Sequence, residues 1–332
     1  LKYKGLGVKG GGRVYLTGNI GEIQPFEFLE NLAPEDWVVY ELSSFQLQDL
    51  DKSPHIGVVL MVTEEHLDYH KDATEYRQAK TAVVKFQNAG DFAVINADFP
   101  GSLEAGGQGL GQKFYFSRKT ELEKGCFVSN GNIVAKGLPF SNFQFPTSRL
   151  QLRGEHNYEN VCAAVLASLA AGADAESVAA TLKNFRGLRH RLQLAAEKDG
   201  TAFYNDSFST VPETAIAAIN SFYEPEIVIL GGSSKHSDFS ELGRTICGRD
   251  NIKGAILIGD EAPRIKEAIE AAGTFRGRLL EGARDMAEIF SQIRTLAKPG
   301  DVVLLSPACA SFGMFKNYKD RGEQFIKAAE AW

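Results

Sequence analysis

The feature that most constrains the fold is an alternation along the chain, in which short apolar runs are separated by longer stretches with a helical period. The short runs are rich in β-branched residues. This order is typical of parallel sheets covered by helices, so the sequence predicts an α/β protein. The predicted strands are residues 13–17, 37–42, 55–62, 92–96, 226–230, 254–258 and 301–305, and the predicted helices include 73–87, 157–171, 175–185 and one beginning at Pro212.

Two hairpins interrupt this order. Residues 126–135 turn through Ser-Asn-Gly-Asn, and residues 192–205 turn at Asp199-Gly200. Both turns contain residues that tolerate a positive φ, as tight hairpins require. We expect the first hairpin to form an antiparallel edge, and we expect the glycine-rich residues 106–111 to be an exposed loop.

A chain of 332 residues is too long for one ordinary core, and its 44% hydrophobic and 23% charged residues are typical of a folded protein. We therefore expect two domains, residues 1–186 and 187–332. The second is expected to be Rossmann-like, because strands and helices follow its opening hairpin in series. The chain does not begin with Met, and we expect it to be a piece of a longer protein.

Composition also narrows the class of partner. A net charge of -6 argues against a surface that binds nucleic acid or an anionic membrane, so any anionic ligand is expected to be small. No apolar run approaches membrane-spanning length. The four cysteines have no CxxC or zinc-ligand spacing, which indicates reduced thiols in a cytoplasmic protein.

Three groups of polar residues in the first half have candidate chemistry. Glu41 and Ser43 follow a predicted strand, where a carboxylate suits Mg²⁺, although Ser43 or Ser44 could equally cap a helix. Residues 63–70 (TEEHLDYH) also follow a strand; they suit either a metal or the N-terminus of a helix. Lys80 lies in the next predicted helix, where a lone lysine is usually a solvated surface residue.

Three turns in the second half follow predicted strands. Residues 205–207 (NDS) suit a ribose or a phosphate, residues 231–235 (GGSSK) suit a carboxylate or a phosphate, and residues 306–311 (SPACAS) let a ligand approach backbone N–H groups. Helix caps and close packing at strand-to-helix turns need the same residue types. The sequence contains no GxxxxGK[ST] phosphate loop, so an ATP-dependent enzyme would need that part of its site from elsewhere.

Seven motifs follow one another along the chain: residues 17–21 (TGNIG), 41–47 (ELSSFQL), 65–68 (EHLD), 154–160 (GEHNYEN), 189–191 (RHR), 205–207 (NDS) and 306–311 (SPACAS). Taken together and in this order, they resemble the Mur ligases, and among them the members that add glutamate to UDP-N-acetylmuramoyl-L-alanine. The resemblance extends from about Val14 to the C-terminus.

The resemblance implies a partial ATPase-type parallel sheet domain followed by a Rossmann-like, glutamate-binding domain, without the family's N-terminal UDP-binding domain and phosphate loop. It implies an ATP-dependent ligase of peptidoglycan precursor synthesis that works through an acyl phosphate. These residues alone are expected to be inactive. The implied ligands are ATP, Mg²⁺, UDP-N-acetylmuramoyl-L-alanine and glutamate, and the protein is expected to be a monomer without nucleic-acid or membrane partners.

The resemblance also implies roles for individual residues. Glu41 and His66 are expected to bind Mg²⁺ with support from Lys80 as a carbamate. The other implied contacts are Asn19 and Ser43 for the muramoyl substrate, Asn157, Asn160, Arg191 and Asp206 for the nucleotide, and Thr210, Lys235, Ser311 and the backbone of Tyr318 for glutamate.

Two positions depart from the family pattern. Phe208 stands where the family usually has lysine, and residues 231–235 contain Ser234 where glycine is usual. These departures leave the glutamate isomer open, so a sister ligase for L-glutamate and a folylpolyglutamate-type ligase are alternatives. A non-catalytic module that binds glutamate or a nucleotide is an alternative of another class.

Overall fold

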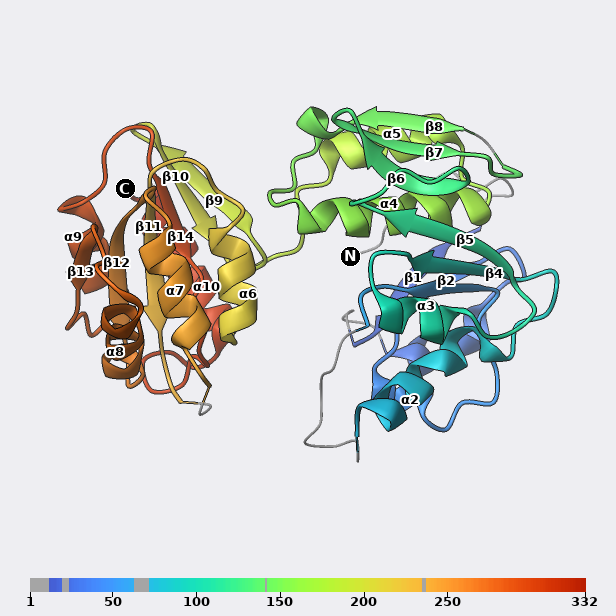
Figure 1. Ribbon diagram of the computed structural model, residues 1–332, viewed down its shortest axis with the longest axis horizontal. Coiled ribbons are helices and arrows are strands. Elements are labelled where there is room, and N and C mark those ends of the chain that lie inside the picture. The colour runs from blue at the N-terminus through green and yellow to red at the C-terminus, as the bar shows by residue number, and fades with distance from the viewer. Residues whose placement is uncertain (1–11, 20–23, 63–71, 141, 235–236) are drawn as a thin grey trace. The chain divides into compact units, whose positions relative to one another are not determined.

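The computed structural model describes residues 12–19, 24–62, 72–140, 142–234 and 237–332, which form two compact units (Figure 1). The N-terminal unit contains the chain up to Leu150 together with Glu155–Asn184. The C-terminal unit contains Gln151–Gly154 and Phe185–Trp332. The short segment 151–154 belongs to the second unit because Arg153 donates hydrogen bonds to the Tyr204 hydroxyl and to Glu224.

The main sheet of the N-terminal unit has six strands in the order β3-β4-β5-β6-β7-β8. The first four strands are parallel, and β7 and β8 extend the sheet as an antiparallel edge. The predicted antiparallel edge is therefore confirmed. The strands are β3 (Ile56–Val59), β4 (Phe92–Asn96), β5 (Gln112–Ser117), β6 (Gly125–Ser129), β7 (Asn132–Lys136) and β8 (Phe143–Pro146).

Helices cover both faces of this sheet. Val59, Ala93 and Ile95 pack against α2 (Ala73–Lys85) and α3 (Pro100–Gly106). The long helix α4 (His156–Ala170) contacts the strands from the other face, and α5 (Ala175–Asn184) packs on α4. The expectation of an exposed loop over residues 106–111 was wrong at both ends of the range. Gly106 ends α3 and is buried against Ile95, and Gly111 is buried against the side chain of Gln87.

A separate parallel pair, β1 (Val14–Gly18) and β2 (Trp37–Glu41), completes this unit. Short 3-10 helices, Pro25–Glu27 and Leu29–Asn31, connect the two strands, and another covers Thr147–Arg149. After β2, the one-turn helix α1 (Ser44–Leu47) packs against α2.

Several large apolar side chains in these strands or just beyond them are exposed. Val39 of β2 is 53% exposed and Met61, beyond β3, is 52% exposed. Within the described residues, β2 pairs only with β1 and β3 pairs only with β4.

The sheet of the C-terminal unit has the order β13-β12-β11-β14-β10-β9, in which only β9 is antiparallel to its neighbour. The predicted hairpin at residues 192–205 forms its edge and turns at Asp199 and Gly200, both with positive φ. The strands are β9 (Gln193–Lys198), β10 (Thr201–Asn205), β11 (Glu226–Gly231), β12 (Ile252–Ile258), β13 (Arg278–Leu280) and β14 (Val302–Leu305).

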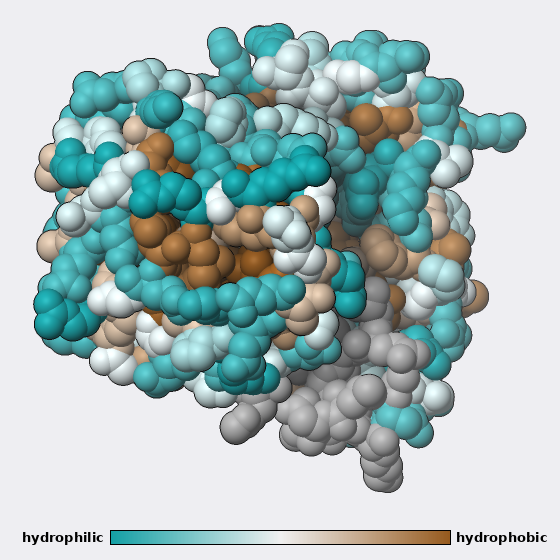
Figure 2. Space-filling view, turned by 60° about the vertical axis from the view of Figure 1, so that its left-hand side comes forward, coloured by the Kyte–Doolittle hydropathy of each residue, from teal (hydrophilic) through white to brown (hydrophobic). Residues whose placement is uncertain are grey.

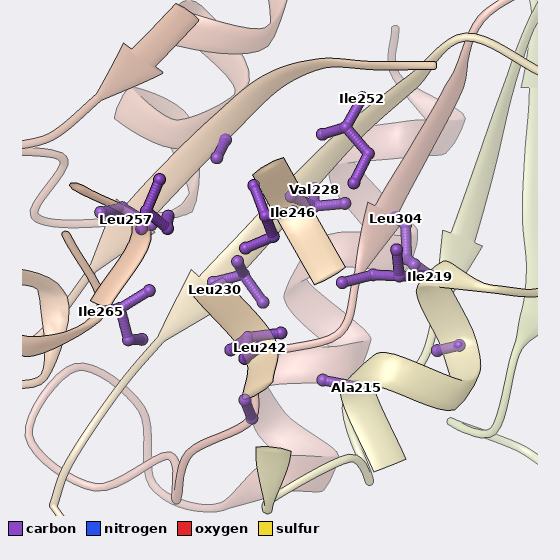
Figure 3. Close-up of a cluster of buried hydrophobic side chains, with 14 of the residues drawn as sticks. Ala215, Ile219, Val228, Leu230, Leu242, Ile246, Ile252, Leu257, Ile265 and Leu304 are labelled. Atoms are coloured by element: carbon purple, nitrogen blue, oxygen red, sulfur yellow. The ribbon is translucent and has the colours of Figure 1, made fainter. Parts of the chain in front are cut away.

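Alternate residues of each buried strand face opposite helical layers. Val228, Leu230 and Leu304 pack against three helices on one face; Figure 3 shows them beside Ile219, Leu242 and Ile265. Ile227, Ile229 and the other side chains of the opposite face pack against two. The first layer is α6 (Pro212–Ile219), α7 (Ser240–Gly248) and α8 (Ala262–Ala272), and the second is α9 (Met286–Arg294) and α10 (Tyr318–Glu330).

Gly231 allows β11 to end in a sharp turn at the carboxyl edge of this sheet. Its φ is +113°, and a Cβ atom there would lie 2.0 Å from the carbonyl oxygen of Ile258. Gly273, at the end of α8, has a φ of +141°, but a Cβ atom added there would meet nothing within 4 Å. An alanine at either position would therefore have a strained backbone, but only an alanine at Gly231 would also clash with a neighbouring atom.

We expect Gly231→Ala to destabilise the C-terminal unit by at least about 1 kcal/mol more than Gly273→Ala, because strain alone costs about 1–3 kcal/mol and the clash is added. Urea unfolding of both variants measures the difference. Equal losses would show that strand β12 yields to the added methyl group.

Candidate functional site

The carboxyl ends of β10, β14 and β11 form the centre of the site in the C-terminal unit. Helices α6 and α7, which follow β10 and β11, lie on one face of the sheet, whereas α10, which follows β14, lies on the other. Neighbouring strands whose connections leave in opposite directions create a crevice, and ligands of open α/β sheets bind there. The three turns singled out in the sequence all begin at these strand ends.

Backbone hydrogen bonds hold the three turns together. The N–H of Asp206 donates to the carbonyl of Leu305 at 2.8 Å, and the N–H of Gly231 donates to Pro307 at 2.7 Å. The N–H of Ser233 donates to the carbonyl of Ala310 at 2.9 Å. These bonds fix the backbones of the turns relative to one another.

Asp206 is buried at the end of β10. Its Oδ2 accepts a hydrogen bond from the Ser306 hydroxyl at 2.7 Å, and its Oδ1 accepts one from the N–H of Leu192 at 3.1 Å. Burial raises the pKa of Asp206 to about 6, although both hydrogen bonds favour the charged form. At neutral pH it is therefore mainly a carboxylate that can accept hydrogen bonds from hydroxyl groups.

Arg321 lies on α10 and is completely buried. Its Nε donates to the hydroxyl of Ser207 at 2.9 Å, and its terminal nitrogens donate to the carbonyls of Ser207, Cys309 and Ala310 at 2.9–3.4 Å. Burial lowers the pKa of Arg321 to about 10, which leaves it charged at neutral pH. One cation thus fastens the turn after β10 and the turn after β14 to α10.

The Ser207 hydroxyl links Arg321 to Tyr318, the first residue of α10. It accepts from Arg321 and donates to the carbonyl of Tyr318 at 2.8 Å. The backbone of Tyr318, which was predicted to contact glutamate, is therefore held next to Ser207. Ser311 is buried in the turn after β14, and Thr210 is half-buried just before α6. Lys235 lies outside the described residues.

His190 is buried next to Asn205, the last residue of β10. Its Nδ1 lies 2.9 Å from Nδ2 of Asn205, and its Nε2 lies 3.3 Å from a carboxylate oxygen of Glu323. The amide of Asn205 is a donor, so Nδ1 accepts and the proton is on Nε2, facing Glu323. Burial lowers the pKa of His190, which keeps the ring neutral near pH 7.

Arg191 is an exposed residue between His190 and Leu192, and Leu192 is hydrogen-bonded to Asp206. Its guanidinium carbon lies 4.0 Å from the centroid of the Phe208 ring. The ring of Phe208 also meets Tyr318 edge-on, with centroids 5.0 Å apart and an interplanar angle of 88°. The predicted nucleotide contacts Arg191 and Asp206 are thus both at the carboxyl edge of β10.

The predicted muramoyl and metal contacts lie in the N-terminal unit. Glu41 is exposed at the end of β2, and its carbonyl accepts a hydrogen bond from the N–H of Asn19 at 3.1 Å. Ser43 caps α1: its hydroxyl accepts from the N–H of Gln46, and the Gln46 side chain accepts from the N–H of Ser43. The capping alternative for Ser43 is therefore observed, and its hydroxyl is engaged within the chain.

Lys80 lies on α2, half-buried, with its ammonium nitrogen 5.5 Å from the centroid of the Tyr76 ring. His66 lies outside the described residues. Across the ranges that the structure describes, no three His, Cys, Asp or Glu side chains are grouped to hold a metal ion.

Asn157 and Asn160 lie in the first turn of α4. The Nδ2 of Asn160 donates to Oδ1 of Asn157 at 3.2 Å, so the two amides form one polar pair. Glu159, on the same turn, is buried and accepts hydrogen bonds from Asn96 at 3.1 Å and from Arg118. These bonds fix the start of α4 on the sheet and hold the asparagine pair in place.

A cavity at this end of the C-terminal sheet is lined by other residues than those described above. It has a volume of about 340 Å³ and is lined by Leu257, Gly259, Ala262, Gly282, Ala283, Arg284 and Met314. Figure 2 shows this unit with a mainly hydrophilic surface and a hollow of apolar side chains.

Among the helices in the described ranges, none has the length and apolar composition needed to cross a bilayer.

Comparison with known proteins supplies the family. A model of the Mur ligase middle domain matches residues 16–168, and a model of the Mur ligase glutamate ligase domain matches residues 190–309. The UDP-N-acetylmuramoylalanine–D-glutamate ligase of Pelotomaculum thermopropionicum is 41% identical over 311 residues, which cover 93% of this chain and 67% of the relative. This chain belongs to the Mur ligase family.

Further relatives agree with this assignment. The ligase of the same name from Symbiobacterium thermophilum is 38% identical over 97% of this chain and 70% of its own length. Two solved Mur ligases share the fold at low identity. One is MurF of Thermotoga maritima in complex with ADP, with a TM-score of 0.64 and 16% identity, covering 96% of this chain and 73% of that one. The other is the UDP-N-acetylmuramoylalanyl-D-glutamyl-2,6-diaminopimelate–D-alanyl-D-alanyl ligase from Acinetobacter baumannii, with a TM-score of 0.67 and 15% identity, covering 96% of this chain and 70% of that one.

Sequence reasoning assigned no role to Arg321, His190 or Glu159, although His190 and Glu159 stand within two of the motifs that resemble the Mur ligases. One signal was present for Arg321. It shares the apolar stripe of α10 with Phe325 and Ala329, at intervals of four residues. A charged residue on an apolar helical stripe is unusual, because burying it requires hydrogen-bond partners.

We expect Asp206 to titrate with a midpoint near pH 6, and the Ser306→Ala variant to titrate higher because the carboxylate loses a donor. Carboxyl ¹³C NMR measures both values. The folded pKa exceeds the ordinary value of 3.8, so the folded state binds the extra proton and Asp206 makes folding less favourable as pH rises from about 4 to 6. An Asp206→Asn variant should lack this part of the pH dependence, and a midpoint below 4 would contradict the burial argument.

We expect Arg321→Lys to lower the free energy of unfolding by about 2–4 kcal/mol, because an ammonium cannot reach Ser207, Cys309 and Ala310 together. Arg244→Lys is the matched control: this exposed arginine pairs with Glu241, and its loss should cost under about 1 kcal/mol. Urea unfolding compares the two. Similar costs would show that Arg321 does not hold the turns.

Proposed function

We propose that this chain provides the nucleotide- and glutamate-binding parts of a ligase that adds D-glutamate to UDP-N-acetylmuramoyl-L-alanine. The main structural support is that Arg321 and Ser207 tie together segments that lie more than 100 residues apart in the sequence. These segments contain Asp206, Ser311 and the backbone of Tyr318. The relatives that are 35–41% identical have the name of this ligase.

The reaction joins an acid to an amine at the expense of ATP. The γ-phosphate is transferred to the substrate carboxylate, the amine of glutamate attacks the acyl phosphate, and inorganic phosphate leaves as the amide forms. In this scheme Asp206 accepts hydrogen bonds from ribose hydroxyls, and Arg191 binds nucleotide phosphate oxygens. Thr210, Lys235, Ser311 and the backbone of Tyr318 hold the two carboxylates of glutamate and so orient its amine.

In the N-terminal unit, Asn157 and Asn160 are proposed to bind the adenine, and Asn19 and Ser43 the muramoyl substrate. The division into residues 1–186 for the nucleotide and 187–332 for glutamate belongs to the same proposal, as does a monomeric, cytoplasmic protein.

Mg²⁺ is proposed to bind at Glu41 and His66. The exposed carboxylate of Glu41 at a strand end fits an ion that takes few protein oxygens and otherwise binds phosphate and water. When bound, the ion would offset negative charge on the phosphates. Carbamylation of Lys80 is also proposed; it needs a neutral amine, so Lys80 must leave the face of the Tyr76 ring, which favours the ammonium form.

One sequence observation favours a second candidate, a module that binds glutamate or a nucleotide without turnover. These 332 residues contain no GxxxxGK[ST] segment to hold the phosphates of ATP. The same observation predicts little phosphate release from this chain alone, so binding and turnover have to be measured separately.

We expect the chain to bind D-glutamate in a calorimetric titration, and Ser311→Ala to weaken that binding about tenfold, which corresponds to one lost hydrogen bond to a charged group. Ser240→Ala, an exposed serine on α7 of the same unit, should bind as the unmodified chain does. A preference for L-glutamate would favour a sister ligase, and no binding of either isomer would refute the glutamate pocket.

Phosphate release with ATP, UDP-N-acetylmuramoyl-L-alanine and D-glutamate then tests turnover, and rapid release by this chain alone would exclude the binding module.

A further inference from the structure

We propose that Phe208 is a positioning residue for Arg191: its ring holds the guanidinium at the carboxyl edge of β10, where Arg191 contacts a phosphate group of the nucleotide. The inference rests on the proposed nucleotide-binding function and assigns a role to a residue that departs from the family pattern. It is carried by the packing of Phe208, which is 39% exposed and therefore contributes little as a core residue.

The Phe208 ring contacts a different group on each side. The guanidinium carbon of Arg191 lies over the ring, 4.0 Å from its centroid, well within the roughly 6 Å over which an aromatic face attracts a cation. The ring of Tyr318 meets it edge-on at 5.0 Å. Tyr318 is itself held by Ser207, so Phe208 rests against a fixed part of the site and Arg191 rests against Phe208.

The backbone places the two side chains opposite each other. The N–H of Phe208 donates to the carbonyl of His190 at 3.0 Å, and the N–H of Leu192 donates to Asp206 at 3.1 Å. These bonds flank Arg191 on one segment and join it to the segment of Phe208. His190 and Leu192 both have positive φ values, 65° and 42°, which are costly for residues other than glycine. The strained backbone on both sides of Arg191 places its side chain over the ring of Phe208.

A stacked guanidinium keeps its N–H groups available. The ring covers one face of the group, whereas the N–H donors point outward in its plane, where they can bind two phosphate oxygens. Arg189 has a different role, because it pairs with Glu323 at 2.5 Å. In the part of the chain that the structure describes, no ion pair joins Arg191 to an acid, although its charge acts at longer range to oppose the effect of burial on the pKa of Asp206.

The stack reduces the cost of ordering Arg191. An exposed arginine loses considerable rotamer freedom when it binds a ligand, and a side chain already held by a ring loses less. Phe208 therefore increases nucleotide affinity without touching the nucleotide. A purely structural aromatic contact would affect stability and leave nucleotide affinity unchanged.

The test titrates MgADP into the 332-residue chain by calorimetry. Phe208→Leu should weaken binding about two- to fivefold, the effect of an exposed cation–π contact, and Phe208→Tyr should restore it because the ring is kept. In an Arg191→Ala background, Phe208→Leu should have no further effect, since residues that act through one another are not additive. Tyr223→Leu, an 81% exposed aromatic residue of the same unit, should bind MgADP normally.

NMR of the Arg191 side chain provides a readout without ligand. Its Hδ and Hε resonances should be shifted upfield by the ring current in the unmodified chain and in Phe208→Tyr, and should return toward ordinary values in Phe208→Leu. Unshifted resonances, or a Phe208→Leu effect that persists in the Arg191→Ala background, overturn the inference while leaving the nucleotide site intact. Shifted resonances without any MgADP binding instead refute the proposed nucleotide contact, and the role of Phe208 with it.

Discussion

The buried guanidinium of Arg321 is the interaction on which the C-terminal site depends. It replaces its lost hydration with hydrogen bonds to Ser207, Cys309 and Ala310, which belong to two different strand-to-helix turns. A buried charge is costly unless such partners surround it, so the geometry of the turns and the position of α10 are fixed together. Asp206, buried nearby, has the opposite charge and raises the pKa of Arg321, which partly balances the effect of burial on the cation.

This arrangement connects the fold to the chemistry of the family. The doubly wound sheet places helices on both faces and brings the ends of β10, β14 and β11 side by side, which creates the crevice. Small residues in the turn after β14 then allow close approach of the backbone, with Ala308 at a φ of +60°. The polar groups in the crevice differ in kind: Asp206 accepts hydrogen bonds, whereas Arg191 donates them. These groups match the ligands proposed for the site: ribose hydroxyl groups donate hydrogen bonds, whereas phosphate and carboxylate oxygens accept them.

Much of the fold could be predicted because local patterns agree with it. The predicted strand 92–96 coincides with β4, and the helix predicted from Pro212 begins there as α6. Residues 106–111 were misjudged because glycine serves loops and close packing alike. Gly106 is needed where α3 meets Ile95, a contact between segments that the local sequence does not reveal. The extent of the third strand was also overestimated, since β3 ends at Val59.

The sequence by itself determined the α/β class, the separate motifs and the residue types that a phosphate, carboxylate or ribose site requires. These follow from periodicity and from the side chains themselves. The tertiary structure decided which motifs meet: Ser207 with Tyr318, Asp206 with Ser306, and Arg191 with Phe208. It also decided that Arg321 is interior, because burial of a charge depends on partners that are brought near only when the sheet is assembled. Pairing and burial are properties of the packed chain, and no window of local sequence contains them.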